Sequence, residues 1–412
     1  MIIIAVLAMG NPHKILQADN DRAAVNTHIY EFNEFKETPA PKGYKPFYVS
    51  HYGRHGARSD WDNGNYDLVI GILEKGREAG ILTPAGDSLL AETRTVKEVH
   101  DGMNGHLTRR GEYEHREIAR RLFARYPEIF SARSANMRVE SSTVPRCLVS
   151  MACFTGELSK LNPTIDFTID SGEKQMAYIA NGPTKEHSLK AAPLVDSLRN
   201  TLVFDTKHTL EVLFTDPDKA AALVGDAETF QNSIWHCARV GKASGVEGNM
   251  FRYLPEEVIY GWWDFWNREL YIGHGNSVEF GDLRMPQTLP LVEATLMKAE
   301  EAIESGKPKA DLVFGHDHPL LAFVSFLGLE GVGERVSFNE IPQKWNDPMN
   351  MPYASNLQMV FYRNKQGDVL VKFVYNDRER RLSGLESSTG PYYKWEDVRE
   401  YINNCISIYK TN

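Results

Sequence analysis

The side chains best suited to chemistry stand between residues 51 and 60, where Arg54, His55 and Arg58 lie within five positions. Gly56 beside them lets the backbone approach a ligand closely. A guanidinium donates paired hydrogen bonds to phosphate or carboxylate oxygens, and a neutral imidazole can act as a nucleophile. The alternative is a pair of surface arginines on a turn. Because the cluster repels itself without a counter-charge, it favours an anionic ligand.

Two further segments repeat the same design of strand, polar residues and helix. Arg146 follows a short strand predicted at residues 137–140, and His316 and Asp317 follow a strand predicted at residues 311–314. The first cluster likewise follows an aromatic and β-branched run at residues 47–50. If these strands are parallel neighbours, their carboxyl ends meet at one edge of the sheet, where ligands bind in α/β proteins.

Brought together, these residues supply the parts of a phosphoryl transfer reaction. The arginines neutralise the oxygens of the transferred group, one histidine attacks phosphorus in line, and a carboxylic acid protonates the departing alkoxide. An aspartic acid donates a proton only when it is protonated. We therefore expect activity at acidic pH or a raised pKa of Asp317.

A metal site formed by His316, Asp317 and His318 is the main alternative, because alternating histidines after a strand can ligate zinc. Such a site needs further histidine or carboxylate ligands, and the sequence holds no second cluster of them. A serine hydrolase is less favoured still, because the GxSxG motif is absent.

Length and composition indicate a globular protein larger than one hydrophobic core. The chain has 412 residues, 42% of them hydrophobic and 25% charged, and its net charge is −9. This size predicts two domains or a core with a cap. The acidic balance argues against nucleic acid or an anionic membrane as the main partner, so the anion site is expected to be a local basic pocket.

The N-terminal residues 1–10 are apolar but too short to span a bilayer. They are similar to the core of an export signal without its basic leading part, which predicts a periplasmic or secreted protein. The alternative is a disordered or strand-like lead-in, and residues 1–25 are assigned to one or the other. The four cysteines show no metal-binding spacing and are expected to be buried thiols, with a single bridge as the alternative.

The hydrophobic periodicity of the rest of the chain predicts two parts, an α/β core and a helical cap. An α/β core is predicted over residues 26–160 and 284–412, interrupted by a mainly helical cap over residues 161–283. A hairpin is expected at residues 357–375, and helices are expected at 66–79, 112–126, 144–158, 202–214, 220–237, 256–271, 286–303, 320–327 and 395–408. The aromatic cluster of Trp262, Trp263, Phe265 and Trp266 has helical spacing and is interpreted as core, with a ligand platform as the alternative.

These motifs resemble those of the histidine acid phosphatases, the branch of the histidine phosphatase superfamily that holds acid phosphatases, phytases and multiple inositol polyphosphate phosphatases. The resemblance rests on RHGAR at residues 54–58, SSTVPRC at 141–147 and GHD at 315–317. LTRRG at residues 107–111 matches the family's LTxxG helix start, and residues 352–356 are similar to its late PxA segment.

The resemblance implies a role for each matched residue. His55 is then the nucleophile that forms phosphohistidine, Asp317 is the proton donor, and the phosphate is held by Arg54, Arg58, Arg146 and His316. It also implies a phosphoglycerate mutase-like α/β sandwich with a helical insertion, and a site without metal or cofactor. The implied function is hydrolysis of phosphate monoesters, with inositol polyphosphates as the leading substrates. The alternatives are a broad acid phosphatase acting on sugar phosphates or nucleotides, and a non-catalytic anion-binding protein.

Three positions depart from the family's pattern. Asp60 stands where proline is usual, Cys147 where threonine is common, and His318 where phytases of this type often have threonine. Residues 59–65, which lie where the family shapes its substrate pocket, contain two carboxylates and no lysine or arginine. This weakens a direct assignment to phytate unless lysines of the cap compensate, and the candidates are Lys185, Lys190 and Lys242.

Overall fold

A computed structural model describes residues 12–410 and contains one mixed sheet. Its strands are β1 (Lys45–Arg54), β2 (Asn136–Ser141), β3 (Asp166–Asp170), β4 (Ala310–Gly315), β5 (Asn356–Arg363), β6 (Val369–Tyr375), β7 (Arg378–Arg380) and β8 (Tyr392–Lys394). They follow the order β3-β2-β4-β1-β5-β6-β7, and β8 pairs with β6. The strands β5 and β6 form the expected hairpin.

The strand β4 is buried along its whole length and lies between β2 and β1, parallel to both. Its sequence is almost entirely apolar, as expected for a central parallel strand covered on both faces. In the register, Arg54 lies beside Gly315, and Ser141 lies beside Phe314. The three carboxyl ends therefore meet, as the sequence predicts.

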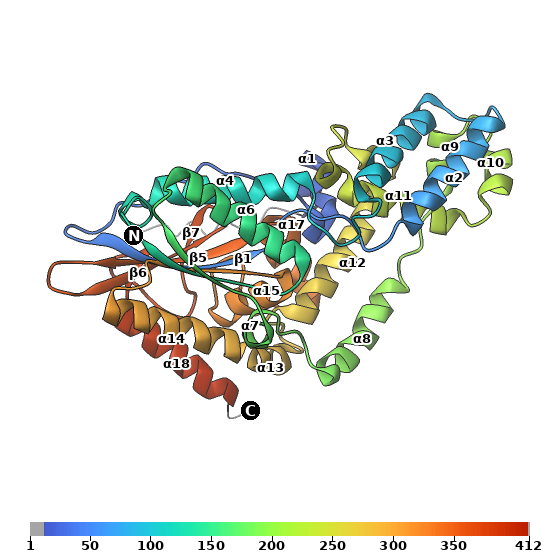
Figure 1. Cartoon of the computed structure of the whole chain (residues 1–412). Coiled ribbons are helices and arrows are strands. Elements are labelled where there is room, and N and C mark those ends of the chain that lie inside the picture. The colour runs from blue at the N-terminus through green and yellow to red at the C-terminus, as the bar shows by residue number, and fades with distance from the viewer. Residues whose placement is uncertain (1–11, 411–412) are drawn as a thin grey trace.

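Helices cover both faces of the sheet (Figure 1). On one face lie α4 (Arg109–Arg125), α5 (Pro127–Phe130) and α6 (Pro145–Leu161). On the other lie α7 (Glu173–Ile179), α14 (Leu289–Ser305), α15 (Asp317–Phe326) and α18 (Trp395–Lys410), with the short α13 (Gly281–Arg284), α16 (Ile341–Lys344) and α17 (Asp347–Asn350) near them. This arrangement confirms the expected α/β sandwich.

A second hydrophobic cluster holds together a separate set of helices, which we call the cap. The cap consists of α2 (Gly64–Glu78), α3 (Pro84–His100), α9 (Lys207–Leu213), α10 (Pro217–Val224), α11 (Ala227–Gly241) and α12 (Glu256–His274). The predicted core included residues 64–100, whereas their apolar faces pack against α11 in the cap. The helix α8 (Lys185–Arg199) runs between core and cap, with Ala191 in the core cluster.

The described N-terminal residues are ordered and packed. They form α1 (Pro12–Ala18) and the 3-10 helix η1 (Asn20–Thr27), and Leu16 and Val25 are buried in the cap cluster. The described part of the predicted lead-in, residues 12–25, is thus largely helical, while residues 1–10, on which the predicted export signal rests, lie outside the described residues. The other 3-10 helices are η2 (Lys242–Ser244), η3 (Met250–Tyr253), η4 (Met285–Thr288) and η5 (Phe338–Glu340).

Three smaller expectations are also answered. All four cysteines are free thiols, and Cys147, Cys153 and Cys237 are buried. Within the described residues, no helix has the length and apolar character needed to cross a membrane. In the aromatic cluster, Trp263 is fully buried in the cap, as the core interpretation predicts, but Trp266 is only partly buried.

Candidate active site

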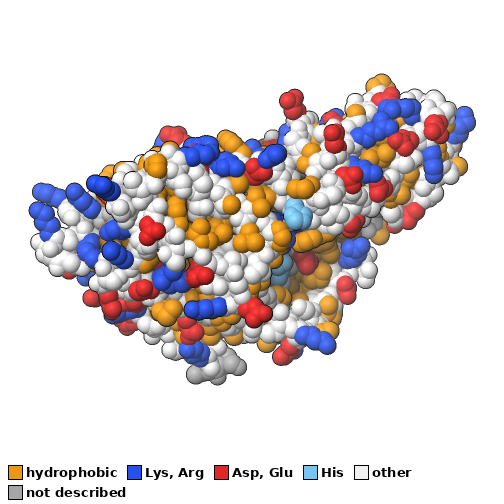
Figure 2. All heavy atoms as spheres, in the orientation of Figure 1, with side chains coloured by type: hydrophobic (Ala, Val, Ile, Leu, Met, Phe, Trp, Pro, Cys, Tyr) orange, Lys and Arg blue, Asp and Glu red, His pale blue; other side chains and the backbone are white. Residues whose placement is uncertain are grey.

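A cavity of about 440 Å³ lies at the carboxyl ends of β1, β2 and β4. It is lined by residues of the core and of the cap, and Figure 2 shows histidine atoms in the hollow between the two parts. All six predicted site residues line it, namely Arg54, His55, Arg58, Arg146, His316 and Asp317. The convergence of the three segments on one site is therefore present in the structure.

The loop after β1 is held by a close contact with the start of α4. A Cβ atom on Gly56 would lie 2.6 Å from the Gly111 carbonyl oxygen, and one on Gly111 would collide with the Ala57 carbonyl oxygen. Both glycines are therefore required by backbone approach rather than by flexibility. The carboxylate of Glu114 accepts from the Ala57 amide at 2.8 Å. The RHGAR and LTRRG motifs thus form one structural unit.

His55 is buried, and its ring is fixed by its own loop. Nδ1 lies 2.9 Å from the Gly56 carbonyl oxygen, so we assign the proton to Nδ1, which leaves the Nε2 lone pair free. Burial and the nearby charges of Arg54 and Arg146 hold the pKa of His55 well below its usual range. The imidazole is therefore neutral, which a nucleophile requires.

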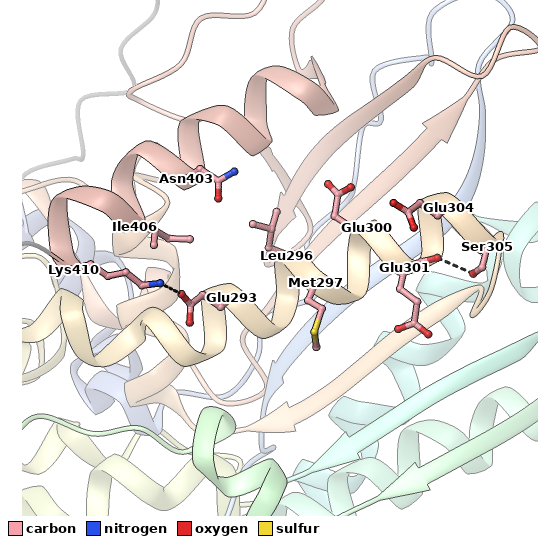
Figure 3. Close-up of a pocket in the computed structure, with 10 residues that line it drawn as sticks. All are labelled: Glu293, Leu296, Met297, Glu300, Glu301, Glu304, Ser305, Asn403, Ile406 and Lys410. Atoms are coloured by element: carbon pink, nitrogen blue, oxygen red, sulfur yellow. Dashed lines mark hydrogen bonds and ion pairs between the residues drawn. The ribbon is translucent and has the colours of Figure 1, made fainter.

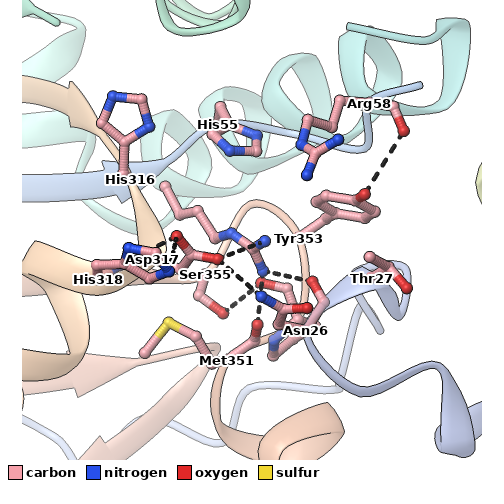
Figure 4. A network of polar contacts seen from close by, with 12 residues as sticks. Asn26, Thr27, His55, Arg58, His316, Asp317, His318, Met351, Tyr353 and Ser355 are labelled. Carbon is pink, nitrogen blue, oxygen red and sulfur yellow. Dashed lines mark hydrogen bonds and ion pairs between the residues drawn. The ribbon is translucent and has the colours of Figure 1, made fainter. Parts of the chain in front are cut away.

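Arg54 is buried, and its partners Asn26, Asp317 and Met351 belong to the polar network drawn in Figure 4. One terminal nitrogen donates to the carbonyl oxygens of Asn26 at 2.6 Å and Met351 at 2.7 Å. The other forms an ion pair with Oδ2 of Asp317 at 2.9 Å. The guanidinium carbon also lies 4.8 Å from the centre of the Tyr353 ring. These partners come from both ends of the chain and fix the guanidinium in one position.

Asp317 begins α15 directly after β4 and is charged in the ligand-free site. Its carboxylate accepts from the Asn26 amide at 3.0 Å and from the His318 backbone amide at 3.0 Å. Burial acts to raise the pKa of Asp317, but Arg54 and the surrounding histidines outweigh it and hold this pKa well below its usual range. The pKa of Asp317 is therefore lowered and not raised as expected, because the Arg54 ion pair and the neighbouring histidines outweigh burial.

Arg58 and Arg146 share one aromatic partner at the mouth of the cavity. Their guanidinium carbons lie 4.3 Å and 4.9 Å from the centre of the Trp61 ring, and that ring is 59% exposed. Arg146 is the second residue of α6, so the positive end of this helix dipole also points to the site. Two arginines and a helix N-terminus thus converge on the space beside His55.

His316 lies close to His55, with ring centres 5.7 Å apart. Its Nε2 lies 2.9 Å from the Ser142 hydroxyl, and its Nδ1 lies 3.4 Å from a nitrogen of Arg146. Burial and the charge of Arg146 lower the pKa of His316 to about 4. The thiol of Cys147 donates to the Gly315 carbonyl oxygen at 3.2 Å, which is the structural role of the residue that replaces threonine.

The alternating histidines do not share a ligand position. The His316 ring turns toward Ser142, whereas the His318 ring stacks on His274 with centres 3.6 Å apart and planes 9° apart. Among residues 12–410, no three His, Cys, Asp or Glu side chains are grouped so that they could hold a metal ion. These side-chain directions do not fit the metal alternative.

The cap contributes residues to the cavity lining that the sequence did not single out, with the exception of Trp266. His236 and Arg239 of α11, together with Trp266 and Glu269 of α12, line the cavity. Each pair is spaced by three positions and lies on one helix face; polar side chains at helical spacing among aromatic residues were the available signal. Of the aromatic cluster, Trp266 lines this cavity, whereas Trp262, Trp263 and Phe265 do not.

A larger cavity of about 620 Å³ lies between α14 and α18 (Figure 3), and it shares no lining residue with the cavity at the strand ends. Four of its ten lining residues are glutamates, and Lys410 pairs with one of them, Glu293, at 2.6 Å. It contains neither a histidine nor an arginine. The smaller cavity at the strand ends is therefore the candidate active site.

Comparison with known proteins gives relatives of one kind. No protein-family model matches the sequence. Human multiple inositol polyphosphate phosphatase 1 is 22% identical over 357 residues, which cover 76% of this chain and 68% of that protein. The Bifidobacterium longum multiple inositol polyphosphate phosphatase in complex with phosphate matches with a TM-score of 0.74 and 16% identity, over 93% of this chain and 98% of that one. The D. castellii phytase matches with a TM-score of 0.70 and 14% identity, over 99% of this chain and 90% of that one.

These comparisons agree with the resemblance inferred from the motifs: the chain has the fold of the histidine acid phosphatases. Within that group, it is similar over most of its length to multiple inositol polyphosphate phosphatases and to a phytase.

Proposed function

We propose that the protein hydrolyses phosphate monoesters through a phosphohistidine on His55. The observation that carries the proposal is the neutral His55 ring, whose Nδ1 is held by the Gly56 carbonyl while Nε2 stays free beside three arginines. An imidazole in this state attacks phosphorus without first losing a proton. The positive charges of Arg58 and Arg146 offset the charge that develops on the phosphoryl oxygens.

The reaction has two steps. Nε2 of His55 forms a bond to phosphorus as the ester P–O bond breaks, and Asp317 gives its proton to the departing alkoxide. Water then attacks the phosphohistidine, the Asp317 carboxylate accepts a proton from it, and the N–P bond breaks to release phosphate. His55 and Asp317 return to their starting states.

The proton on Asp317 has to arrive with the substrate, because the carboxyl is ionised in the ligand-free site. A bound phosphate ester brings negative charge next to Arg54 and thereby raises the pKa of Asp317. A substrate that binds as the monoanion also carries the required proton. Since the second pKa of a phosphate ester is about 6, we expect activity to fall as the pH rises above that value.

Inositol polyphosphates are the substrates that the relatives favour, since the matched proteins are named as inositol polyphosphate phosphatases and a phytase. A broad range of sugar phosphates or nucleotides is the alternative, and a panel of these esters compared by kcat/KM distinguishes the two. A non-catalytic anion-binding role does not use the free Nε2 of His55 or the carboxyl of Asp317.

The test of the mechanism is trapping of the intermediate. Mixing the protein with labelled phosphate ester and quenching with denaturant at alkaline pH is expected to leave label on the protein, and His55→Ala is expected to lose both label and turnover. Label that persists in His55→Ala refutes His55 as the nucleophile. Full turnover of nitrophenyl phosphate in a chelator is expected, and chelator-sensitive turnover contradicts the mechanism.

The proposed location is the periplasm or the extracellular space. It rests on the apolar residues 1–10, which lie outside the described residues. Expression in a bacterial host, followed by cell fractionation and mass measurement, tests it. An uncleaved protein in the cytoplasmic fraction contradicts the proposal.

A further inference from the structure

The cavity is balanced in charge, which is unusual for a site that binds a strongly anionic substrate. Its four arginines face four carboxyl groups, and no lysine lines it among the described residues. The arginines are Arg54, Arg58, Arg146 and Arg239, and the carboxyl groups belong to Asp60, Asp62, Glu269 and Asp317.

The cap lysines considered in the sequence do not supply the missing charge. Lys185, Lys190 and Lys242 are absent from the cavity lining. Lys190 pairs with Glu186 at 2.7 Å, and Lys242 pairs with Asp21 at 3.4 Å. The positive charge that reaches the cavity is therefore that of the arginines.

The histidines of the cavity do not change this balance near neutral pH. Burial, with the charge of Arg239 beside it, lowers the pKa of His236 to about 4. The pKa values of His55, His316 and His318 are also lowered, with burial as the largest cause. All four rings are therefore neutral when a phosphate ester is a dianion.

Three of the arginines belong to the site of the reacting phosphate. Arg54 is paired with Asp317, and the guanidinium groups of Arg58 and Arg146 share the Trp61 ring. These arginines stand at the ends of β1 and β2, next to His55. A single phosphoryl group bound next to His55 is therefore expected to be shared by these three guanidinium groups.

Arg239 is the cation of the cavity that remains for another group. Its nitrogens donate to the Thr27 hydroxyl at 3.2 Å and to the Asn26 side-chain oxygen at 3.4 Å, and its guanidinium carbon lies 5.5 Å from the Trp266 ring centre. No carboxylate within 4.0 Å pairs with it among the described residues. Its hydrogen-bond partners are neutral, but the carboxyl groups of Asp60 and Glu269 lie close enough to interact with its charge. The guanidinium can therefore bind one anionic group that competes with these two carboxyl groups.

The remaining wall is acidic. Asp60 accepts from the Tyr66 hydroxyl at 3.4 Å, and Asp62 accepts from the Gly64 amide at 2.8 Å. Burial and the charge of Asp317, opposed by Arg239, raise the pKa of Glu269. In its ionised form, such a carboxyl group accepts a hydrogen bond from an alcohol and repels a second phosphate.

We propose that the cavity selects compact polyol phosphates that carry two phosphate groups, one on the His55 side and one on Arg239, with free hydroxyls facing Asp60 and Glu269. This inference rests on the proposed phosphatase activity and narrows its substrate class. A fully phosphorylated inositol places five phosphates outside the reacting position, and the cavity offers a single arginine for all of them. The others meet carboxylates, which disfavours their binding.

The first test measures kcat/KM for myo-inositol hexakisphosphate, a tetrakisphosphate and a bisphosphate, each relative to nitrophenyl phosphate as the reference with one phosphate. We expect the bisphosphate to exceed the hexakisphosphate by at least about tenfold. A wild-type protein that prefers the hexakisphosphate overturns the inference. A wild-type protein that hydrolyses none of the four, including nitrophenyl phosphate, refutes the proposed function instead.

The second test changes Arg239 and the acidic wall in separate variants. Arg239→Met is expected to lower kcat/KM for the bisphosphate at least about tenfold more than for nitrophenyl phosphate. The matched control is Arg199→Met, since Arg199 also stacks on cap aromatics, at 5.6 Å from Trp262, but lies outside this cavity. An equal loss on both substrates in Arg239→Met overturns the assignment of Arg239.

Glu269→Gln and Asp60→Asn test the acidic wall by a gain in relative activity on the hexakisphosphate, which misfolding cannot produce. Each is expected to raise the ratio of hexakisphosphate to bisphosphate kcat/KM by several fold. Glu257→Gln, an exposed site on the same helix α12, is the matched control and is expected to leave the ratio unchanged. An unchanged ratio in both cavity variants overturns the proposed role of the acidic wall.

Discussion

Replacing Asp317 by asparagine separates two effects that the carboxyl group has in this site. The variant keeps a side chain of the same shape but has no proton to donate and no charge. A general acid contributes about 10² to 10⁴ in rate when the leaving group is a poor one. We therefore expect Asp317→Asn to lower kcat by that factor for an alkyl phosphate, and by less than about tenfold for nitrophenyl phosphate, whose leaving group needs little protonation.

The same change should strengthen the binding of inorganic phosphate. In the ligand-free site, Asp317 holds Arg54 at 2.9 Å and places a negative charge next to the phosphate position. Two like charges about 5 Å apart repel by about 1 kcal/mol in water and about 3 kcal/mol at an effective dielectric constant of 20. Removing one charge is therefore expected to lower the inhibition constant of phosphate by about 5-fold to 150-fold.

The fold should tolerate this substitution. Arg54 keeps its hydrogen bonds to the Asn26 and Met351 carbonyl oxygens and its contact with Tyr353. The assay is steady-state kinetics on both esters, with phosphate inhibition measured on nitrophenyl phosphate. Equal losses on the two esters would refute the role of Asp317 as proton donor, and weaker phosphate inhibition would refute its repulsion of the bound anion.

Three further predictions concern Trp61, which contacts Arg58 and Arg146, and the buried residues His51 and Phe314. Trp61→Ala removes two cation–π contacts, each worth about 0.5–1 kcal/mol, so KM for nitrophenyl phosphate is expected to rise about 5-fold to 30-fold. Trp61→Phe keeps an aromatic ring and is expected to have a KM near that of the wild type. Identical KM values in the wild type and both variants would contradict this prediction. The pKa of His51 is lowered by burial to about 3, below its unfolded value of 6.5, so the unfolded state binds more protons between these pH values and stability falls as the pH is lowered. The free energy of unfolding measured in urea should therefore fall as the pH is lowered toward 4, and His51→Phe should reduce the slope of this fall by up to about 1.4 kcal/mol per pH unit; parallel curves would exclude His51 as a contributor. Phe314→Ala, in the buried strand β4, is expected to lower the free energy of unfolding measured in urea by about 3–5 kcal/mol. A loss below about 1 kcal/mol would show that neighbouring side chains fill the space left by the Phe314 ring.

The chemistry-bearing segments were predictable because each combines a local strand signal with charged residues directly after it. Arg146 and Asp317 follow β2 and β4 as expected, whereas Arg54 is the last residue of β1, which runs four residues beyond the predicted strand. The parallel pairing of these strands then brings the three residues together. Helices with strong periodicity were also predicted within a few residues, such as α12 and α18. The predicted helix at 220–237 is instead α10 and α11, because Gly225, with φ of 73°, ends the first of them.

Contacts between distant segments were not predictable from local pattern. The helix α3 joins the cap because Leu89, Leu90 and Val96 pack against α11, and nothing in residues 84–100 indicates which partner they meet. The charge of Asp317 depends on Arg54 and Asn26, which are far from it in sequence. The sequence predicts a carboxyl group at the site, but its ionisation is set by tertiary neighbours.

The contact between Asn26 and Asp317 has a consequence for how activity appears during folding. It joins residues 291 positions apart, and Arg54 needs Met351 as well. A chain shorter than about 351 residues therefore lacks a completed phosphate site, however well its cap has folded. Because closing such long loops comes late and slowly, recovery of turnover after dilution from denaturant should lag behind recovery of helix signal. The recovery of turnover then reports when the contacts of Asn26 with Asp317 and of Arg54 with Met351 have formed.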